Sequence, residues 1–247
     1  MASEVEMRNV SVAAPAGATI LRDVSWRAAP QESVALIGRS GAGKTTTLRL
    51  INGLVNPTRG QVLVDGADLA QTDLITLRRR TGYIIQGSGL FPHRTVYENV
   101  ATVPRLLGWN EDKTRAAATE LMEKLAIPFD RFAHRKPRSL SGGEQQRAGI
   151  ARALIANPPL LLCDEPFGAL DPIVRRELQQ AFVALRADAT IVFVTHDLNE
   201  ALRVAQKIVL FDGGTIVAEC ATGDFLRCDL PLARELVASA TLAADVA

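Results

Sequence analysis

One segment of the chain combines glycines, a lysine and a threonine at a spacing suited to binding phosphate groups. Residues 38–45 read G-R-S-G-A-G-K-T and fit the pattern G-x-x-x-x-G-K-[ST]. They follow the apolar run V-A-L-I and precede a stretch of helical periodicity, so bare backbone N–H groups and the positive end of a helix dipole would face a phosphate. In this arrangement Lys44 bridges phosphates and the Thr45 hydroxyl binds Mg²⁺.

The alternative for this segment is a glycine-rich turn that only caps the helix. Such a turn would not explain Lys44, because the helix dipole disfavours a cation in the first turn unless an anion lies nearby. We therefore expect a nucleotide-phosphate site. Its contacts would come from consecutive residues: Gly38, Arg39, Ser40, Gly41, Ala42, Gly43, Lys44, Thr45 and Thr46.

Two adjacent carboxylates form a second candidate group. The run L-L-L-C-D-E-P at residues 160–166 predicts a buried strand that delivers Asp164 and Glu165 to the edge where an open α/β sheet binds ligands. Asp164 would hold Mg²⁺, and Glu165 would polarise the water that attacks the terminal phosphate. The alternative is a strand that runs into an ordinary acidic, solvated loop. The phosphate-binding segment upstream favours the catalytic interpretation.

His196 lies at the end of a third expected strand, after the run T-I-V-F-V-T at residues 190–195. In that position it could hydrogen-bond the terminal phosphate. A lone histidine more often has a structural role, which is the alternative here.

The composition is that of an ordinary globular protein, with 247 residues, 47% of them hydrophobic, and a formal net charge of +1. So small a charge does not point to nucleic acid, and the basic clusters at 78–80 and 134–138 are expected to be solvated faces. No apolar run reaches the roughly 18 residues of a spanning helix, and the first ten residues lack the apolar core of a secretion signal. The scattered cysteines and histidines argue against disulfides and structural zinc.

Strand-like segments alternate with helical ones in a way that predicts an α/β fold. The first two strands would form an antiparallel region, with a turn at Pro15-Ala16-Gly17, and the later strands a mainly parallel sheet closed by a hairpin. The expected strands cover residues 5–12, 19–26, 33–37, 60–65, 160–164 and 190–195, with the hairpin at 209–219.

A helix is predicted directly after the phosphate-binding segment, because Leu48, Ile51 and Leu54 recur at helical spacing, and Gly53 is expected to cap its C-terminal end. Another is predicted to begin after Ser141, where Glu144 at the third helical position would complete a capping box. A mainly helical region is interpreted as an inserted subdomain. The expected bounds are 86–157 for this insert, 111–126 and 141–156 for its two clearest helices, 1–230 for a single domain and 231–247 for a C-terminal tail.

Taken in order, these motifs resemble the ATP-binding subunit of ABC transporters. The resemblance extends over nearly the whole chain and rests on six segments in the family's order and spacing. They are G-R-S-G-A-G-K-T, Gln86 in Y-I-I-Q, L-S-G-G-E-Q-Q-R at 140–147, Leu160 to Glu165, Ala169-Leu170-Asp171 and Thr195-His196-Asp197. The resemblance implies a P-loop NTPase core with ATP and Mg²⁺ as cofactors and ATP hydrolysis as the activity.

The resemblance also implies roles for residues outside the phosphate-binding segment. In such proteins two copies pack head to tail, and the signature segment of one copy faces the nucleotide of the other. Ser141, Gly142 and Gly143 would then offer a hydroxyl and bare N–H groups at a positive helix end to the γ-phosphate. Gln86 would contact Mg²⁺ or the attacking water, and Asp171 would reach into the site of the second copy.

Partners are implied in the same way. The helical insert would contact membrane permease subunits, and a solute-binding protein would act through that permease. The chain would lie peripherally on the cytoplasmic face of the cell membrane, with no transmembrane segment and no nucleic-acid partner. ATP would close the dimer and hydrolysis would reopen it.

One departure from the family concerns the nucleotide base. The family usually has an aromatic residue that stacks on adenine in the loop after the first strand, where this chain reads V-A-A-P-A-G and has Ala13 and Ala14. Stacking is worth about 1–3 kcal/mol per base, so we expect weaker ATP affinity or base selectivity unless another side chain substitutes. Trp26 falls in the second strand and Trp109 in the helical insert.

Longer segments are similar to the importer ATPases for glycine betaine, choline and other osmoprotectants. They read L-R-L-I-N-G-L-V-N-P-T-R-G, G-Y-I-I-Q-G-S-G-L-F-P-H-R-T-V-Y-E-N-V and V-P-R-L-L-G-W. The expected function is therefore to energise such an importer. The alternatives are ATPase subunits for amino-acid or metal import or for lipid or drug export, and a soluble ABC-type ATPase that acts on nucleic acid.

Overall fold

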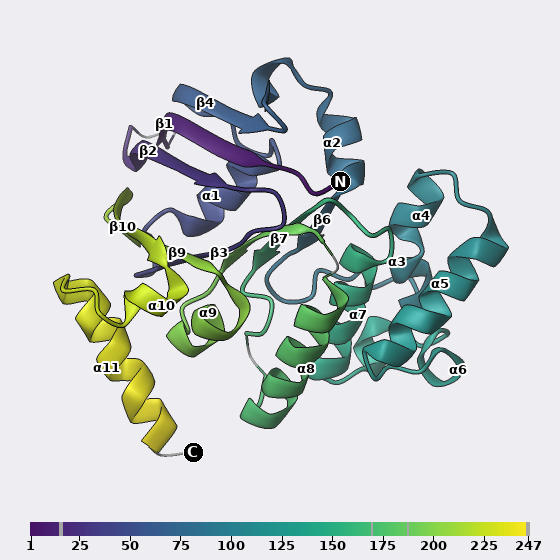
Figure 1. Ribbon diagram of the computed structural model, residues 1–247. Helices are drawn as coiled ribbons and strands as arrows, with labels where there is room; N and C mark the ends of the chain where they lie inside the picture. Colours follow the sequence, from purple (N-terminus) through teal and green to yellow (C-terminus); the bar gives the residue numbers. More distant parts are fainter. Residues whose placement is uncertain (15–16, 169, 187, 246–247) are drawn as a thin grey trace. The chain divides into compact units, whose positions relative to one another are not determined.

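The computed structural model describes residues 1–14, 17–168, 170–186 and 188–245, which form two compact units. The first unit comprises Met1–Leu74 and Thr190–Ala247, and the second comprises Ile75–Ala189. Both units are α/β (Figure 1), as the sequence predicts. The first contains an antiparallel sheet, and the other strands of the chain are mostly parallel. The predicted insert at 86–157 falls inside the second unit, which extends further on both sides.

The first unit contains an antiparallel sheet that confirms the predicted N-terminal region. Its burial alternates along β1, where Val5 and Met7 are buried between more exposed residues, because successive side chains of a strand point to opposite faces. Pro15 and Ala16 of the predicted turn lie outside the described residues. The strands, in spatial order, are β2 (Thr19–Ala28), β1 (Val5–Ala13), β4 (Arg59–Val64) and β5 (Ala67–Asp68).

A second set of strands in the first unit positions the phosphate-binding segment. The strands β3 (Ser33–Gly38) and β8 (Thr190–Val194) are parallel and buried along their whole length, as expected of strands covered on both faces. On the other side of β3 lies β9 (Lys207–Asp212), also parallel, which forms the predicted closing hairpin with β10 (Thr215–Ala221).

The helix after the phosphate-binding segment ends at the glycine that the sequence predicts as its cap. Leu48 and Ile51 are fully buried in α1 (Lys44–Ile51), and Gly53 has a left-handed φ of 61°, which ends the helix. Leu54 follows this glycine and is 52% exposed, so it does not extend the apolar face of the helix. The other helices of the first unit are η1 (Leu69–Gln71), α9 (Leu198–Val204), α10 (Thr222–Phe225) and α11 (Pro231–Asp245).

The second unit contains two parallel strands and a group of helices. The strand β7 (Leu160–Asp164) is buried throughout, as predicted, and pairs with β6 (Thr81–Ile84), which the sequence pattern does not predict. The helix α7 packs against α3, α5, α8 and β6, and it runs beside α8 (Figure 1). The helices are α2 (Leu74–Arg80), which begins at the unit boundary, α3 (Val96–Val100), α4 (Thr102–Leu106), α5 (Glu111–Lys124), α6 (Phe129–Phe132), η2 (Pro137–Ser139), α7 (Gly142–Leu154) and α8 (Pro172–Leu185).

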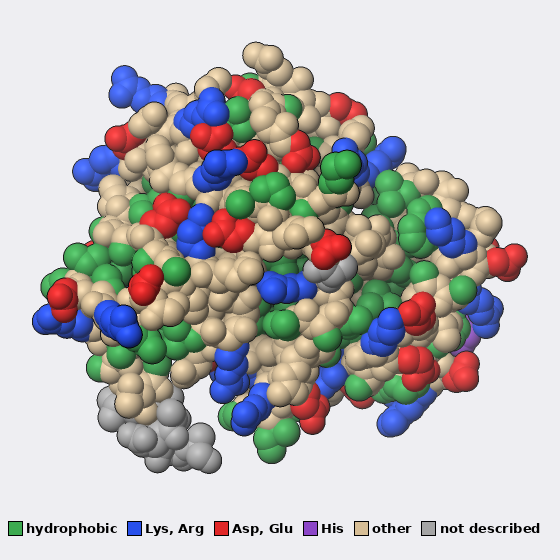
Figure 2. All heavy atoms as spheres, viewed as in Figure 1, with side chains coloured by type: hydrophobic (Ala, Val, Ile, Leu, Met, Phe, Trp, Pro, Cys, Tyr) green, Lys and Arg blue, Asp and Glu red, His purple; other side chains and the backbone are tan. Residues whose placement is uncertain are grey.

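The distribution of charges on the surface and the polarity of the helices both agree with the composition. On the face drawn in Figure 2, basic and acidic side chains are interspersed and do not gather into one field, in keeping with the net charge of +1. Among the described residues, no helix combines the length and apolar character needed to cross a bilayer.

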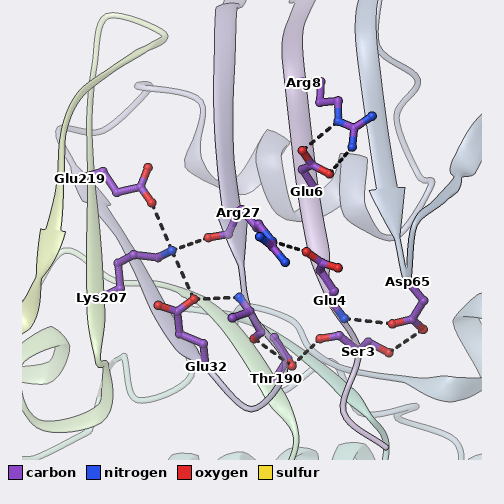
Figure 3. Close-up of polar contacts among 11 residues, drawn as sticks. Ser3, Glu4, Glu6, Arg8, Arg27, Glu32, Asp65, Thr190, Lys207 and Glu219 are labelled. Carbon is purple, nitrogen blue, oxygen red and sulfur yellow. Dashed lines mark hydrogen bonds and ion pairs between the residues drawn. The ribbon is translucent and has the colours of Figure 1, made fainter.

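A polar network centred on Lys207 joins the two sheets of the first unit (Figure 3). Lys207 Nζ lies 3.2 Å from a Glu32 carboxylate oxygen and 3.1 Å from one of Glu219, and it also donates to the carbonyl of Arg27 at the end of β2. The Lys207 side chain is only 18% exposed. This ammonium therefore connects β2 and β10 through the buried strand β9.

We predict that Lys207→Met lowers the free energy of unfolding by about 1–3 kcal/mol, because two carboxylates and a carbonyl lose a charged donor. Urea denaturation followed by circular dichroism would measure the loss. Lys124→Met is the matched control, since the Lys124–Glu120 pair is exposed on both sides and such pairs contribute little. Equal losses in the two variants would contradict a special role for Lys207.

Candidate functional site

The phosphate-binding segment, residues 38–45, forms a tight loop between β3 and α1. Gly38 has a φ of 139°, and a Cβ there would lie 2.1 Å from the carbonyl oxygen of Phe211. Gly43 has a φ of 95°, and a Cβ there would lie 2.3 Å from the Leu21 side chain. Both φ values lie in the region that residues with a side chain rarely adopt, and at Gly38 a Cβ would also collide with the backbone. The two glycines therefore permit a tight turn here, as the sequence pattern predicts.

Lys44 lies inside this loop. Its side chain is buried, and Nζ donates to the carbonyls of Gly38 and Arg39, each at 2.8 Å. These carbonyls stabilise a cation at the positive end of α1, where it would otherwise be disfavoured. The ammonium is thus held by two carbonyls of the loop at the start of α1.

Arg39 and Ser40 are exposed on the loop, and Arg39 connects it to the C-terminal helix. Its Nη2 lies 2.7 Å from a carboxylate oxygen of Glu235 on α11. This hydrogen bond, with the charges of Glu235 and Asp212, raises the pKa of Arg39 above its usual value. The pair is solvent-exposed, so its contribution to stability is small.

His196 shares an edge of the first unit with the phosphate-binding loop. Because β3 and β8 are parallel, with Leu36 opposite Val194, their carboxyl ends meet at the same side of the sheet. His196 is exposed there, two residues past the end of β8. Its neighbour Asp197 caps α9 by accepting from the amide of Asn199 at 2.8 Å. The predicted proximity of His196 to the loop thus follows from the sheet topology.

In the second unit the structure brings Gln86 and Glu165 together. Gln86 Nε2 donates to Glu165 Oε2 at 3.0 Å, because β6 and β7 are parallel and both residues follow the ends of these strands. Asp164 is buried at the end of β7. Beside it, burial and the Asp164 charge raise the pKa of the Cys163 thiol.

The backbone of Glu165 is in an unusual conformation. Its φ is 49°, in the left-handed region, which costs about 1–3 kcal/mol for a residue other than glycine and is typical of functional sites. The side chain is half-buried. The left-handed backbone lies directly after Asp164, the last residue of β7.

The start of α7 has the predicted capping box. Ser141 Oγ accepts from the Glu144 amide at 3.3 Å, and the Glu144 carboxylate accepts from the Ser141 amide at 2.8 Å. Gly142 is exposed, and a Cβ there would meet no atom of the chain within 4 Å. Packing within the chain therefore does not require a glycine at position 142.

Asp171 has a role within its own chain. As the N-cap of α8 its carboxylate accepts from the amides of Ile173 at 3.1 Å and Val174 at 3.0 Å. The side chain is exposed, and its predicted contact with a second copy stays a prediction. Ala169 of the same motif lies outside the described residues.

The loop after β1 offers no aromatic side chain among its described residues, which include Ala13 and Ala14 but not residues 15 and 16. Trp26 is 4% exposed in β2, so it cannot stack on a base at the surface. Trp109 belongs to the second unit and packs against the Lys113 ammonium, 4.0 Å from the ring centroid.

Sequence patterns missed two residues on the inner side of α7. Gln146 is buried and donates to the carbonyl of Pro166, next to Glu165. Arg152 donates to the carbonyls of Ser88 and Gly89, close to Gln86. The sequence signal that could have identified them is a polar residue on the apolar face of a predicted helix, because a buried polar side chain needs a specific hydrogen-bond partner.

Comparison with known proteins identifies relatives over most of the chain. The family model described as "ABC transporter" matches residues 21–168. A choline transport ATP-binding protein of Bacillus subtilis is 45% identical over 223 residues, 90% of this chain and 58% of the relative. An osmoprotectant import ATP-binding protein of Salmonella typhimurium is 47% identical, over 79% of this chain and 51% of the relative. The chain thus spans little more than half the length of these relatives.

Solved structures give the same result for the fold. An ATP-binding cassette in a dimeric post-hydrolysis state, bound to ADP and Pi, is 33% identical with a TM-score of 0.81, over 88% of this chain and 98% of that chain. An Atm1-family bacterial ABC exporter with ATP bound is 30% identical with a TM-score of 0.84, over 96% of this chain and 42% of that chain.

Proposed function

Because the chain belongs to the ABC transporter family, as an ATP-binding cassette, we propose that it hydrolyses ATP to energise an importer for osmoprotectants such as glycine betaine or choline. The observation that carries the ATPase part is the loop around Lys44, whose ammonium is fixed by two loop carbonyls at the start of α1. That geometry provides a cation at the start of a helix, where the phosphates of ATP would bind.

Hydrolysis would use the residues of the second unit. Glu165 would accept a proton from the attacking water, and Gln86, hydrogen-bonded to it, would orient that water or contact the metal. His196 would hydrogen-bond the γ-phosphate. The donors expected to bind Mg²⁺ are the Thr45 hydroxyl, the Gln86 amide and the Asp164 carboxylate, and oxygen ligands of this kind suit that ion. When bound, Mg²⁺ would neutralise the charge on the phosphate oxygens.

The signature segment would act on a second copy of the chain. Ser141, Gly142 and Gly143 lie at the start of α7, and Asp171 is exposed at the start of α8, so all four are available to a nucleotide on the partner. Support comes from the dimeric state of the similar cassette bound to ADP and Pi. We propose a head-to-tail dimer that ATP closes and hydrolysis opens.

The substrate class rests on the names of the relatives. Those named for choline, osmoprotectant or glycine betaine transport are 45–48% identical to this chain, which favours quaternary amines over the solutes of other importers. The partners would be a membrane permease and a solute-binding protein, with the chain at the cytoplasmic face of the membrane. The similarity to an exporter cassette concerns the fold and does not favour export.

Purification from native membranes tests this proposal. The chain should co-purify with a permease and a solute-binding protein, and the binding protein should bind glycine betaine or choline tightly. Binding of an amino acid or a metal would overturn the substrate class and leave the ATPase proposal intact. A chain that associates with no membrane protein would contradict the transport function as a whole.

The variant Gly142→Ala should lose ATPase activity without losing stability. The Cβ has room within the chain, and alanine favours a helix by up to about 1 kcal/mol over glycine, so stability should stay constant or rise. ATPase activity should fall about tenfold, because the added methyl group would hold the partner's phosphate away from the start of α7 and weaken a hydrogen bond of about 1–1.5 kcal/mol. Gly223→Ala on α10, which is equally open, should leave ATPase activity unchanged. Full activity in Gly142→Ala would argue against contact with a nucleotide.

A further inference from the structure

Arg152 on α7 makes hydrogen bonds to residues 88 and 89, in the segment that follows Gln86. Arg152 Nη1 donates to the carbonyl of Gly89 at 2.7 Å and Nη2 to that of Ser88 at 3.3 Å, while the guanidinium lies 5.7 Å from the centroid of the Phe91 ring. Burial lowers the pKa of Arg152. A cationic donor to two carbonyls in partly desolvated surroundings is a strong contact, worth more than a neutral hydrogen bond.

The same segment touches α7 closely at a second point. A Cβ on Gly149 would lie 2.8 Å from the Ser88 carbonyl oxygen, so only a glycine lets the two backbones approach this far. Ser88 is buried and has a φ of 66°, a conformation that a serine keeps only where its surroundings impose it. Loss of the Arg152 contacts should therefore let the backbone at Ser88 move to a less strained conformation.

The segment after Gln86 and the helix α7 are each connected to the candidate catalytic residues. Two residues before Ser88, Gln86 donates to Glu165 at 3.0 Å. On α7, Gln146 donates to the carbonyl of Pro166, which follows Glu165. The helix that begins at Ser141 therefore contacts the backbone on both sides of the Gln86–Glu165 hydrogen bond.

On the far side the segment is fixed to α3. Asn99 is fully buried, accepts from the Phe91 amide at 2.7 Å and donates to the Phe91 carbonyl at 3.2 Å. Residues 88–91 are thus held by Arg152 from one helix and by Asn99 from another. Arg152 is the contact closer to Gln86, so its loss should affect that end most.

We propose that Arg152 is a positioning residue for ATP hydrolysis, which keeps Gln86 against Glu165 by holding the Ser88 and Gly89 carbonyls on α7. The inference rests on the proposed ATPase function. Loss of Arg152 would let Gln86 sample other orientations, and misplacement by about 1 Å can cost up to about 10²-fold in rate. Because none of the described contacts of Arg152 involves the phosphate-binding loop, the affinity for ATP should stay unchanged.

The kinetic test uses Arg152→Met, with Arg105→Met as the matched control. Arg105 lies on α4 of the same unit, and its guanidinium is also close to an aromatic ring, 5.6 Å from the centroid of Tyr97. It donates to the Glu111 carboxylate at 3.3 Å and, among the described contacts, not to residues 86–91. In Arg152→Met we expect kcat to fall at least about tenfold with KM for ATP within about twofold of the wild type. Arg152→Lys, which keeps one donor, should recover part of the rate.

Hydrogen exchange supplies a second measurement that does not depend on activity. The amides of residues 87–91 should exchange faster in Arg152→Met and keep wild-type protection in Arg105→Met, at a temperature where circular dichroism shows all variants folded. An unchanged kcat in Arg152→Met, or an equal loss of kcat in Arg105→Met, would overturn the proposal. A wild-type chain without ATPase activity would instead overturn the proposed function, and exchange would still decide whether Arg152 holds the segment.

Discussion

Replacement of Glu165 by Gln slows ATP hydrolysis by about 10²–10⁴-fold, the usual contribution of a general base. Glutamine keeps the size of the side chain and can still pair with Gln86, whose amide lies 3.0 Å from Glu165 in the native chain. It cannot take a proton from water at neutral pH. The variant should therefore bind ATP as the wild type does and accumulate as an ATP-bound dimer, which single-turnover kinetics and size-exclusion chromatography with ATP would detect.

Glu120→Gln provides the comparison for this experiment. Glu120 is an exposed carboxylate of the second unit, paired only with Lys124 at 2.6 Å among the described contacts, and its loss changes the net charge by the same amount. Turnover should stay at the wild-type level in that variant. If Glu165→Gln also turned over normally, the role of general base would belong to another group and the Gln86–Glu165 pair would be structural.

The second large effect is expected at Lys44. Lys44→Ala should weaken ATP binding by about 10- to 100-fold, because a hydrogen bond from a charged group contributes about 1.5–3 kcal/mol. The variant also leaves the carbonyls of Gly38 and Arg39 without the donor that now lies 2.8 Å from each. Titration of the purified chain with a fluorescent ATP analogue would measure the loss directly, without hydrolysis or a membrane partner.

Arg49→Ala is the control for this titration. Arg49 lies on the same helix and carries the same charge, but its side chain is exposed in the last turn of α1. It should change ATP affinity by less than about twofold, since an exposed charge is largely screened by salt. A loss as large as that of Lys44→Ala would mean that net charge governs binding, and unchanged affinity in both would contradict the phosphate site at residues 38–45.

The chain's own amino-acid order determined the features that depend on near neighbours. The glycines and lysine of residues 38–45 predict a tight loop between a strand and a helix by their spacing alone, and Ser141 with Glu144 specifies a capping box, because these contacts lie within one loop or one helical turn. Continuous apolar runs likewise predicted β3, β7 and β8 almost to the residue. Gly53 likewise marked the end of α1, although helical spacing alone would have extended the helix to Leu54.

Only the tertiary structure decided which distant residues meet. Gln86 and Glu165 are 79 residues apart and come together because β6 and β7 pair in parallel. No local pattern in either segment predicts the hydrogen bond between them. The strained backbone of Glu165 and the contact of Arg152 with Ser88 and Gly89 likewise depend on how α7 packs. Local patterns encode contacts along the chain, whereas these depend on strand register and side-chain packing between elements, which no single segment contains.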